Sequence, residues 1–438
     1  MAKPKNQKPP FALRALAAFA VTLAALFVLL LAAYALPGEP VRDHVYDSAV
    51  KIAGEGLYPE YLNFKLFQMD NYTDTIMLTE AASADEAPPL TAMMTNTAYN
   101  VDNFETLADD LQWYIERDWA AGAQRTDAPA LVPFSYARYW HGYLIWLRPL
   151  LLVTDITGVR VVQYLVLAAL FAAVAVLLRR RCGLRAAVWF AVSQLLVTAF
   201  WAPHQVQFFT CFAVAYAGCV WVLAKPRRSD DVCLALLVLG VVTSFCDLLV
   251  TPVLPLGLPL VCWLLEPQQR LRAGTRQCGI VVGGSLTWGV GYLLCWASKW
   301  VLAGLVTGQN VIADALHQVG VRTAADSWHG MELTWGNILH FVYTTLAAKH
   351  LFWPLVLAVV LLLALFAASI RDRQQLARAL PLGLCALMTP AWFIVLRTHS
   401  IQHGWFTWRA LGLTVFAGLA FLYYCCDVRQ IAKRLKRT

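Results

Sequence analysis

The sequence predicts an all-α polytopic membrane protein with about ten transmembrane helices and a long extracytoplasmic first loop that contains amphipathic helices. The first observation is composition: 59% of the 438 residues are hydrophobic, 14% are charged, and the mean hydropathy is +0.56. Soluble domains carry roughly 25% charged residues, so this chain is too apolar to be one. The second is that several apolar runs approach the ~20 residues that cross a bilayer. The third is that short basic clusters follow these runs, as the positive-inside rule predicts.

The order of apolar and polar segments gives the expected topology. A basic cytoplasmic tail (1–14) precedes the first transmembrane helix (15–36), which exceeds the ~7–15 apolar residues of a signal peptide and is expected to be retained. An extracytoplasmic acidic loop (37–157) follows. A second extracytoplasmic loop (298–350) separates helices two to seven (158–297) from helices eight to ten (351–425), and a basic tail (426–438) ends the chain. Within these blocks the spans are expected at 158–178, 184–201, 206–224, 232–249, 253–265, 279–296, 351–370, 379–396 and 410–424.

This count places every basic cluster on one side of the membrane, with both termini in the cytoplasm. The net charge of +8 is therefore explained by topology, and we expect a lipid bilayer and no nucleic acid as a partner. The eleven cysteines are absent from the first loop and most fall within apolar runs, where a thiol usually acts as a small buried apolar group. The expected location is the plasma membrane, multi-pass, with any active site on the extracytoplasmic face.

The first external loop holds most of the acidic residues of the chain, although carboxylates are costly near a membrane. Residues 104–119 carry apolar side chains at helical spacing, which predicts an amphipathic helix. Later in the loop, aromatic residues crowd around Arg138 and His141. They form either an aromatic belt at the membrane interface or a platform that stacks sugar rings or an isoprenoid. A loop this rich in acids is expected to carry the chemistry.

The strongest candidate motif in that loop is Asp70-Asn71-Tyr72-Thr73-Asp74. Two acids four residues apart share a face if the segment is helical. One of them, Asp74 or Asp70, is then a candidate general base that takes a proton from an acceptor hydroxyl. The other orients that hydroxyl or holds a cation, with Tyr72 as a supporting residue. The alternative is a capped turn on a solvated loop, where Asp and Asn are common.

A second candidate cluster lies between the ninth and tenth spans and contains Arg397, His399, His403, Trp405 and Arg409. Arg can bind two phosphate oxygens at once, and His adds a titratable donor. The four basic residues are therefore predicted to bind a phosphate, with Trp405 in support. The alternatives are interfacial side chains that reach lipid headgroups and a His-based metal site, which the neighbouring arginines disfavour by charge repulsion.

Further polar residues are expected on the same side as these two clusters. Arg138 and His141 precede the second span, and Asp247 lies near the outer end of the fifth, where an ionisable group needs a partner or a function. The other candidates are His204, Asp314, His317, Asp326, His329, Glu332, Lys349 and His350. No phosphate-binding Gly-rich loop with GK[ST], no HExxH and no GxSxG is present.

With its acid-bearing first loop and its many spans, the chain resembles the GT-C superfamily of integral-membrane glycosyltransferases. It is similar to bacterial cell-envelope members whose loops read DNxTD and HSxxHxWFTxR, which here are 70–74 and 399–409. The resemblance implies an inverting transfer of a sugar from a polyprenyl-phosphate donor to a glycan, lipid or protein acceptor. Asp74 or Asp70 would be the base, and Arg409, His399 and His403 would hold the donor phosphate.

The resemblance leaves three points open. In many family members the key acid closely follows the first span, where this chain has Glu39 and Asp43. Some members use a divalent cation such as Mg or Mn and others use none, so the metal requirement is unknown. The rival functions are a cell-envelope polysaccharide polymerase or ligase with a lipid-pyrophosphate donor, a lipid or glycan transporter, and a non-catalytic assembly partner.

Overall fold

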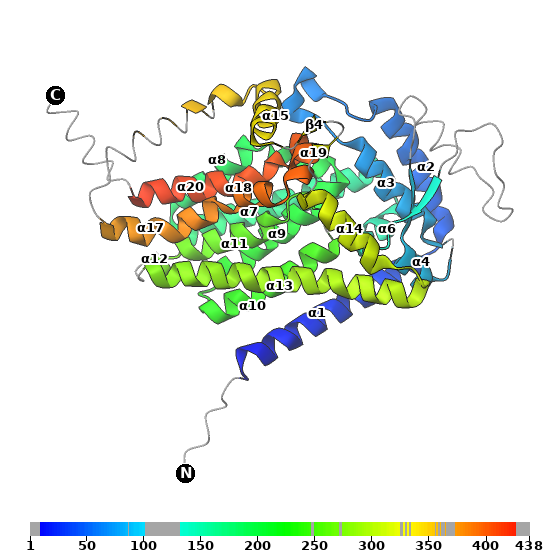
Figure 1. Ribbon diagram of the computed structural model, residues 1–438, viewed down its shortest axis with the longest axis horizontal. Coiled ribbons are helices and arrows are strands. Elements are labelled where there is room, and N and C mark those ends of the chain that lie inside the picture. Colours follow the sequence, from blue (N-terminus) through cyan, green and yellow to red (C-terminus); the bar gives the residue numbers. More distant parts are fainter. Residues whose placement is uncertain are drawn as a thin grey trace, which may run out of the picture.

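The computed structural model describes residues 9–425 apart from 86, 101–131, 247–248, 271–273, 325–326, 329–330, 333, 355, 358–359, 361–363 and 365–372. It is a helical polytopic membrane protein: seven of its described segments are helices long and apolar enough to cross a membrane. Figure 1 shows most of them as roughly parallel rods. The described blue and cyan elements between 37 and 157, which we call the first external segment after its predicted location, are gathered at one end. The polytopic helical class predicted from the sequence is therefore confirmed.

Most of the predicted spans correspond to single helices. These are α1 (Phe11–Tyr34), α7 (Ile156–Cys182), α8 (Leu184–Leu196), α9 (Val206–Ala224), α10 (Ser229–Cys246), α11 (Val253–Leu265), α13 (Gly274–Thr307) and α20 (Leu411–Cys425). The predicted ninth span is divided between α17 (Arg373–Ala386) and α18 (Met388–Val395). Helices α8 and α11 are apolar but only 13 residues long. The predicted eighth span, 351–370, lies largely outside the described residues.

The first external segment contains several short elements that pack on the bundle. They are α2 (Gly38–Glu55), η1 (Tyr61–Asn63), η2 (Lys65–Phe67), α3 (Asn71–Ala82), η3 (Ser83–Asp85), α4 (Pro89–Thr95), β1 (Thr97–Asn100), β2 (Val132–Ser135) and α6 (Leu144–Leu151). Strands β1 and β2 pair antiparallel. Helix α3 packs against α2 and α9, so the acidic motif at its start faces the membrane bundle. The amphipathic helix predicted at 104–119 lies outside the described residues.

The later elements outside the long spans are also helical for the most part. They are η4 (Ala199–His204), α12 (Pro267–Arg270), α14 (Val311–Ala324), β3 (Ser327–Trp328), β4 (Met331–Glu332), α15 (Trp335–Ala348), α19 (Arg397–Thr407) and η5 (Trp408–Ala410). Strands β3 and β4 form a second antiparallel pair. Helix α19 packs against α14, α15 and α18. The predicted phosphate-binding cluster, 397–409, therefore lies on a helix and a helical turn.

The basic ends of the spans meet on one side of the bundle, which we call the basic side. Arg14 near the start of α1 pairs with Asp231 at the start of α10 at 3.2 Å. On α7, Arg181 pairs with Glu266 after α11 at 2.8 Å. Arg270 donates to the carbonyl oxygen of Arg378 on α17. These contacts join five span ends, as the alternation of basic clusters predicted.

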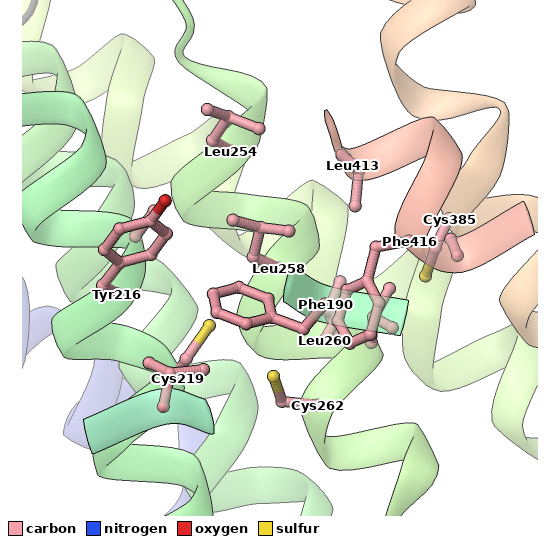
Figure 2. Close-up of a cluster of buried hydrophobic side chains, with 14 of the residues drawn as sticks. Phe190, Tyr216, Cys219, Leu254, Leu258, Leu260, Cys262, Cys385, Leu413 and Phe416 are labelled. Atoms are coloured by element: carbon pink, nitrogen blue, oxygen red, sulfur yellow. The ribbon is translucent and has the colours of Figure 1, made fainter. Parts of the chain in front are cut away.

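The core of the bundle is formed by side chains from α7, α8, α9, α11, α17 and α20. Figure 2 shows Phe190, Tyr216 and Phe416 packed around Leu258 and Leu260, with the thiols of Cys219 and Cys262 facing each other. All ten cysteines in the described part of the chain are free, and seven of them are buried. Their surroundings match the predicted role of small apolar core residues.

Helix α13 extends beyond the position where the sequence predicted that the seventh span ends. It runs to Thr307, whereas the prediction placed its end near Trp296. The reason is Lys299, whose position in the sequence indicates a polar boundary but whose ammonium is buried and bonded to Met93 O at 2.6 Å and Asn96 Oδ1 at 2.7 Å. With these acceptors in place the helix continues to ~51 Å at 1.5 Å per residue, well beyond a ~30 Å hydrocarbon core.

Glycine allows α10 and α13 to approach closely. A Cβ atom on Gly240 would lie 2.2 Å from the carbonyl oxygen of Trp288, and one on Gly291 would lie 2.4 Å from that of Leu237. Small residues at such crossings are typical of membrane helices, because they let backbones touch. We expect Gly240→Ala to destabilise the protein by ~1–3 kcal/mol, since the backbone oxygen has no free space to move into. Thermal unfolding in detergent measures this.

The matched control for this substitution is Gly289→Ala on the same helix pair, because a Cβ at Gly289 meets nothing within 4 Å. It should leave the unfolding temperature unchanged or slightly higher, since Ala has the better helix propensity. Equal midpoints for the Gly240 and Gly289 variants would contradict the close crossing of the two helices.

Candidate functional site

Asp70 starts helix α3 and holds it against the bundle. Its carboxylate accepts hydrogen bonds from Thr73 N at 3.1 Å and from Thr73 Oγ1 at 2.7 Å, so it is the N-cap of the helix. Gln207 Nε2 on α9 donates at 3.0 Å to Oδ2, the oxygen that also accepts from Thr73 Oγ1. The side chain is only 2% exposed. The helical arrangement of the motif predicted from the sequence is present, and its first acid is buried at a helix–helix contact.

Asp74, one turn later, lies against the start of α9. Its carboxylate accepts from Val206 N at 3.0 Å and 3.2 Å, and from Gln207 N at 3.4 Å. The N-terminus of a helix carries free N–H groups and a partial positive charge, so it favours an anion. Both acids of the motif therefore converge on the first turn of α9, one through backbone amides and one through Gln207.

A partly buried ion pair that the sequence reasoning missed lies next to these acids. Arg160 on α7 binds Glu55 at the end of α2 with two contacts of 2.5 Å and 2.9 Å. Its Nε donates to the carbonyl oxygen of His204 at 3.0 Å, and Asn71 Nδ2 donates to Glu55 at 3.0 Å. Arg160 stands inside a predicted span, and an ionisable residue there is itself a signal of a partner or a function.

Burial changes the protonation of these groups in opposite directions. Desolvation raises the pKa of Asp74 to about 7, against the Arg160 charge and the backbone donors that lower it, and the Asp70 charge adds to the rise. Desolvation likewise raises the pKa of Asp70. The pKa of Glu55 falls although burial opposes this, because Arg160 bonds to it. Burial and the Arg160 charge lower the pKa of His204 to about 4. Asp74 is thus the carboxyl whose pKa lies near neutrality.

Arg409 is a buried guanidinium without an acidic partner among the described residues. It lies on η5 and is 1% exposed. Its Cζ lies 4.8 Å from the ring centre of Phe208 and 5.6 Å from that of Trp408. Its NH1 makes a long contact of 3.4 Å to Phe406 O, and its Nε has no hydrogen-bond partner among the described residues. A buried charge left this poorly satisfied is costly, so an anionic ligand would be stabilised beside it.

Lys349 brings a second cation to the same place. Its Nζ lies 5.7 Å from the centre of the Trp408 ring, close to the distance of Arg409 from that ring, and donates to Lys65 O at 2.8 Å. Burial, together with the positive charge of Arg409, lowers its pKa to about 7. An anion between the two side chains would relieve that repulsion. Lys349 was a minor candidate from the sequence and becomes a central one here.

The first turn of α9 links the acidic and the cationic groups. Gln207 contacts both Asp70 and Asp74, and the next residue, Phe208, lies against the guanidinium of Arg409. A second bridge joins the first external segment to α19, where the rings of Tyr58 and Trp405 meet at 5.5 Å. The structure thus brings the acidic motif and Arg409 of the second cluster, which are 335 or more residues apart in the sequence, to one turn of one helix.

His399 and His403 lie one turn apart on α19, with ring centres 4.6 Å from each other. His399 is buried, its Nε2 donates to Leu249 O at 3.0 Å, and its Nδ1 has no partner. Arg322 on α14 interacts electrostatically with both rings, and the sequence reasoning missed it. It also lines a cavity of about 90 Å³ together with Arg138, Trp296 and Trp300. In the sequence, the only sign of Arg322 was a basic residue near the end of an amphipathic helix.

The remaining predicted residues are distributed around this centre. Arg397 is half-buried at the start of α19, and its Nε has no partner. Tyr72 is half-buried on α3 and interacts with Tyr58. Arg138 pairs with Asp314 at 3.2 Å, and His141 lies with Glu80, at the other end of α3 from Asp74. Asp247 lies outside the described residues, as do Asp326 and His329.

The acid pair does not fit a divalent cation. Both carboxylates already accept hydrogen bonds from two or more donors, and Arg160 adds a positive charge beside them. In the described part of the chain, no group of three or more His, Cys, Asp or Glu side chains is arranged to hold a metal ion. We therefore assign no metal to this centre.

The chain was compared with protein-family models, curated proteins and solved structures, and none of the three comparisons finds a match.

Proposed function

We propose that the protein is a membrane glycosyltransferase of the GT-C type, which moves a sugar from a polyprenyl-phosphate donor to a glycan, lipid or protein acceptor. One observation carries the proposal. A buried carboxyl pair lies around the same turn of α9 as a buried guanidinium that has no acidic partner in the part of the chain that the structure describes. Acid–base work on a hydroxyl needs the first, and binding of a phosphate leaving group needs the second.

In the proposed reaction, Asp74 takes the proton of the acceptor hydroxyl as its oxygen attacks the anomeric carbon. The bond between that carbon and the phosphate oxygen breaks, and its electron pair leaves with the polyprenyl phosphate, so the anomeric centre inverts. Arg409 and Lys349 offset the negative charge on the departing phosphate. Asp70 accepts hydrogen bonds from Thr73 and Gln207 and caps helix α3, and in this way it holds Asp74 in position.

The topology required by this reaction is a further part of the proposal. Seven long helices, the shorter α8 and α11 and the segment 351–370 would give ten spans, with both termini on the basic side in the cytoplasm. The active centre then faces outward from the plasma membrane, where polyprenyl-linked donors present their sugars. The support for this orientation is the set of basic contacts that joins α1, α7, α10, α11 and α17 on one side.

The direct test is transfer by purified protein in nanodiscs. Labelled sugars on polyprenyl monophosphate are supplied with a lipid extract as the source of acceptors, and label in new products is measured. We expect turnover with a monophosphate donor. Absence of product from every monophosphate donor, together with translocation of the intact donor in vesicles, would replace the enzyme with a transporter.

A pyrophosphate-using polymerase or ligase is the second candidate, because the cationic side chains near α19 outnumber those needed for one phosphate. Besides Arg409 and Lys349, they include Arg322, which interacts electrostatically with His399 and His403. The same assay with a polyprenyl-pyrophosphate donor separates the two. Turnover only with pyrophosphate would overturn the monophosphate proposal and favour this candidate.

A further inference from the structure

An apolar groove lies on the side of the bundle where α1 meets α9 and α10. Its volume is about 620 Å³, within the ~300–1,000 Å³ of typical ligand pockets. Ala18 lines it on α1, and Ala217 and Gly218 line it on α9. The turns of α10 from 231 to 239 complete the lining. The small side chains on α1 and α9 leave the space between the three helices unfilled.

Helix α1 diverges from the bundle at this groove. Its buried side chains all lie between residues 30 and 34, at the end far from the groove, whereas Leu16 and Val21 are 64% and 69% exposed. Figure 1 shows α1 at the edge of the molecule, at an angle to the other long helices. The near end is held to α10 by the contact between Arg14 and Asp231. In a bilayer the groove therefore opens to the hydrocarbon, and apolar chains rather than water fill it.

The charged groups of the groove lie at one end of it, on the basic side. Of its ten lining residues, only Arg227 and Asp231 are charged. The Cζ of Arg227 lies 3.7 Å from the centre of the Trp221 ring, and its Nε and NH2 donate to Trp221 O at 3.1 Å and 2.8 Å. Among the described residues these bonds leave NH1 for another acceptor. Arginine and tryptophan together are typical of the level of the lipid headgroups.

The net charge around this end is positive. The segment 225–228 reads Lys-Pro-Arg-Arg, and its three basic side chains have no acidic partner in the part of the chain that the structure describes. Asp231 is already offset by Arg14 at 3.2 Å. Asp230 is the remaining acid here and is exposed. Three cations against one acid attract an anion, as basic clusters beside a membrane do.

The dimensions of the groove and its charge select a lipid over a helix. Between 231 and 239, α10 rises ~12 Å at 1.5 Å per residue, which is within one leaflet of a ~30 Å hydrocarbon core. A second copy in the same orientation would bring its own basic ends to this level and repel 225–228. An anionic phospholipid brings an acyl chain to the apolar walls and a phosphate to the basic end.

We propose that this groove binds an anionic glycerophospholipid from the leaflet on the basic side. One acyl chain lies along α10, and the phosphate lies beside Arg227. The groove contains none of the residues of the proposed transfer site, so its occupancy does not depend on transfer by the protein.

Native mass spectrometry of the full chain in detergent tests the proposal, with phosphatidylglycerol and phosphatidylcholine of identical acyl chains as separate probes. We expect phosphatidylglycerol to bind at least fivefold more tightly. Arg227→Gln should weaken its binding about fivefold, the usual effect of one basic residue near an anionic lipid. Ala217→Leu, which fills the groove from an exposed position on α9, should weaken both lipids.

Asp231→Asn gives a test of opposite sign. It removes a negative charge from the groove, so phosphatidylglycerol should bind more tightly than to wild type. The contact with Arg14 is partly exposed, and such pairs contribute little to stability, so the variant should fold.

Two variants are matched controls. Arg185→Gln removes an arginine that lies over a ring, that of Tyr423 at 5.1 Å, but lines no part of this groove. Ala168→Leu enlarges an exposed alanine on α7. Both should bind lipid like wild type. All variants must elute as folded monodisperse protein, and Ala217→Leu decides the result should Arg227→Gln fail to fold.

Four outcomes would overturn the proposal. They are equal affinity for the two phospholipids, wild-type binding in both groove variants, tighter binding of polyprenyl monophosphate than of phosphatidylglycerol, and a dimer that Ala217→Leu separates. The last would assign the groove to a second copy of the chain.

Discussion

Asp74→Asn is expected to reduce sugar transfer by a factor of about 10²–10⁴, the usual contribution of a general base. The amide retains an oxygen that can accept from Val206 N, so the contact between α3 and α9 should persist. The variant should therefore be produced as folded membrane protein with bound-donor affinity close to wild type. Turnover per folded molecule, measured at saturating donor, gives the comparison.

The pH profile provides a second check on the same residue. Because the pKa of Asp74 is raised to about 7, the carboxylate form needed for catalysis increases as pH rises, so transfer should rise toward about pH 7. Above that pH transfer should fall, because Lys349, whose pKa is also about 7, loses the proton that offsets the phosphate charge. The contribution of Asp74 to folding stability changes with pH in the opposite direction to transfer. The folded state holds a proton that the unfolded state releases near 3.8, so the contribution of Asp74 to stability is full below that pH and is lost as pH rises to about 7. Asp74→Asn should remove both the rise in transfer and this loss of stability.

The control for this prediction is Asp47→Asn, an exposed acid on α2 that should keep full activity and the wild-type pH profile. A wild-type rate in the Asp74 variant would remove Asp74 from the proposed mechanism. Loss of activity in Asp70→Asn alone would transfer the role of base to Asp70.

Arg409→Met is expected to separate stability from function. Methionine fills a similar volume between Phe208 and Trp408 and removes a buried charge without an acidic partner, so unfolding temperature should stay the same or rise. Transfer should fall by about 10²–10³, the usual loss when one donor to the developing charge is removed. Thermal unfolding and turnover are measured on the same preparation.

Two matched variants sharpen this result. Arg409→Lys keeps the charge but loses the forked donor geometry, and should retain a small part of the activity. Arg185→Met removes an exposed arginine on the helix α8, where it contacts Tyr423, and should leave transfer unchanged. A marked loss of stability in Arg409→Met would indicate a structural role for the guanidinium and contradict a site that awaits an anion.

The sequence was sufficient for the class of protein and for most helix positions, because long apolar runs and basic ends reflect a single physical constraint, the bilayer. For α9 and α11 the predicted and observed bounds are identical. It failed at the end of α13, because the partners of Lys299 come from 93–96, about 200 residues away. Periodicity reports the local environment and carries no information on such distant acceptors.

The candidate site was likewise predictable from the sequence only in part. The residue types at 70–74 and at 397–409 were visible as unusual clusters, and helical spacing correctly placed Asp70 and Asp74 on one helix end. The roles of Arg160, Arg322 and Lys349 depend on which helices pack together, and no local pattern records that. His141 was expected only on the same side of the membrane as the acid motif, and it contacts Glu80, which lies at the opposite end of α3 from Asp74.

Binding of unlabelled polyprenyl monophosphate, measured in nanodiscs by tryptophan fluorescence, tests most directly whether one ligand spans both clusters. The proposed site predicts similar affinity for wild type and Asp74→Asn, and at least tenfold weaker binding for Arg409→Met, although both variants are inactive in transfer. Equal binding by all three proteins would contradict the assignment of the phosphate to Arg409 at the first turn of α9.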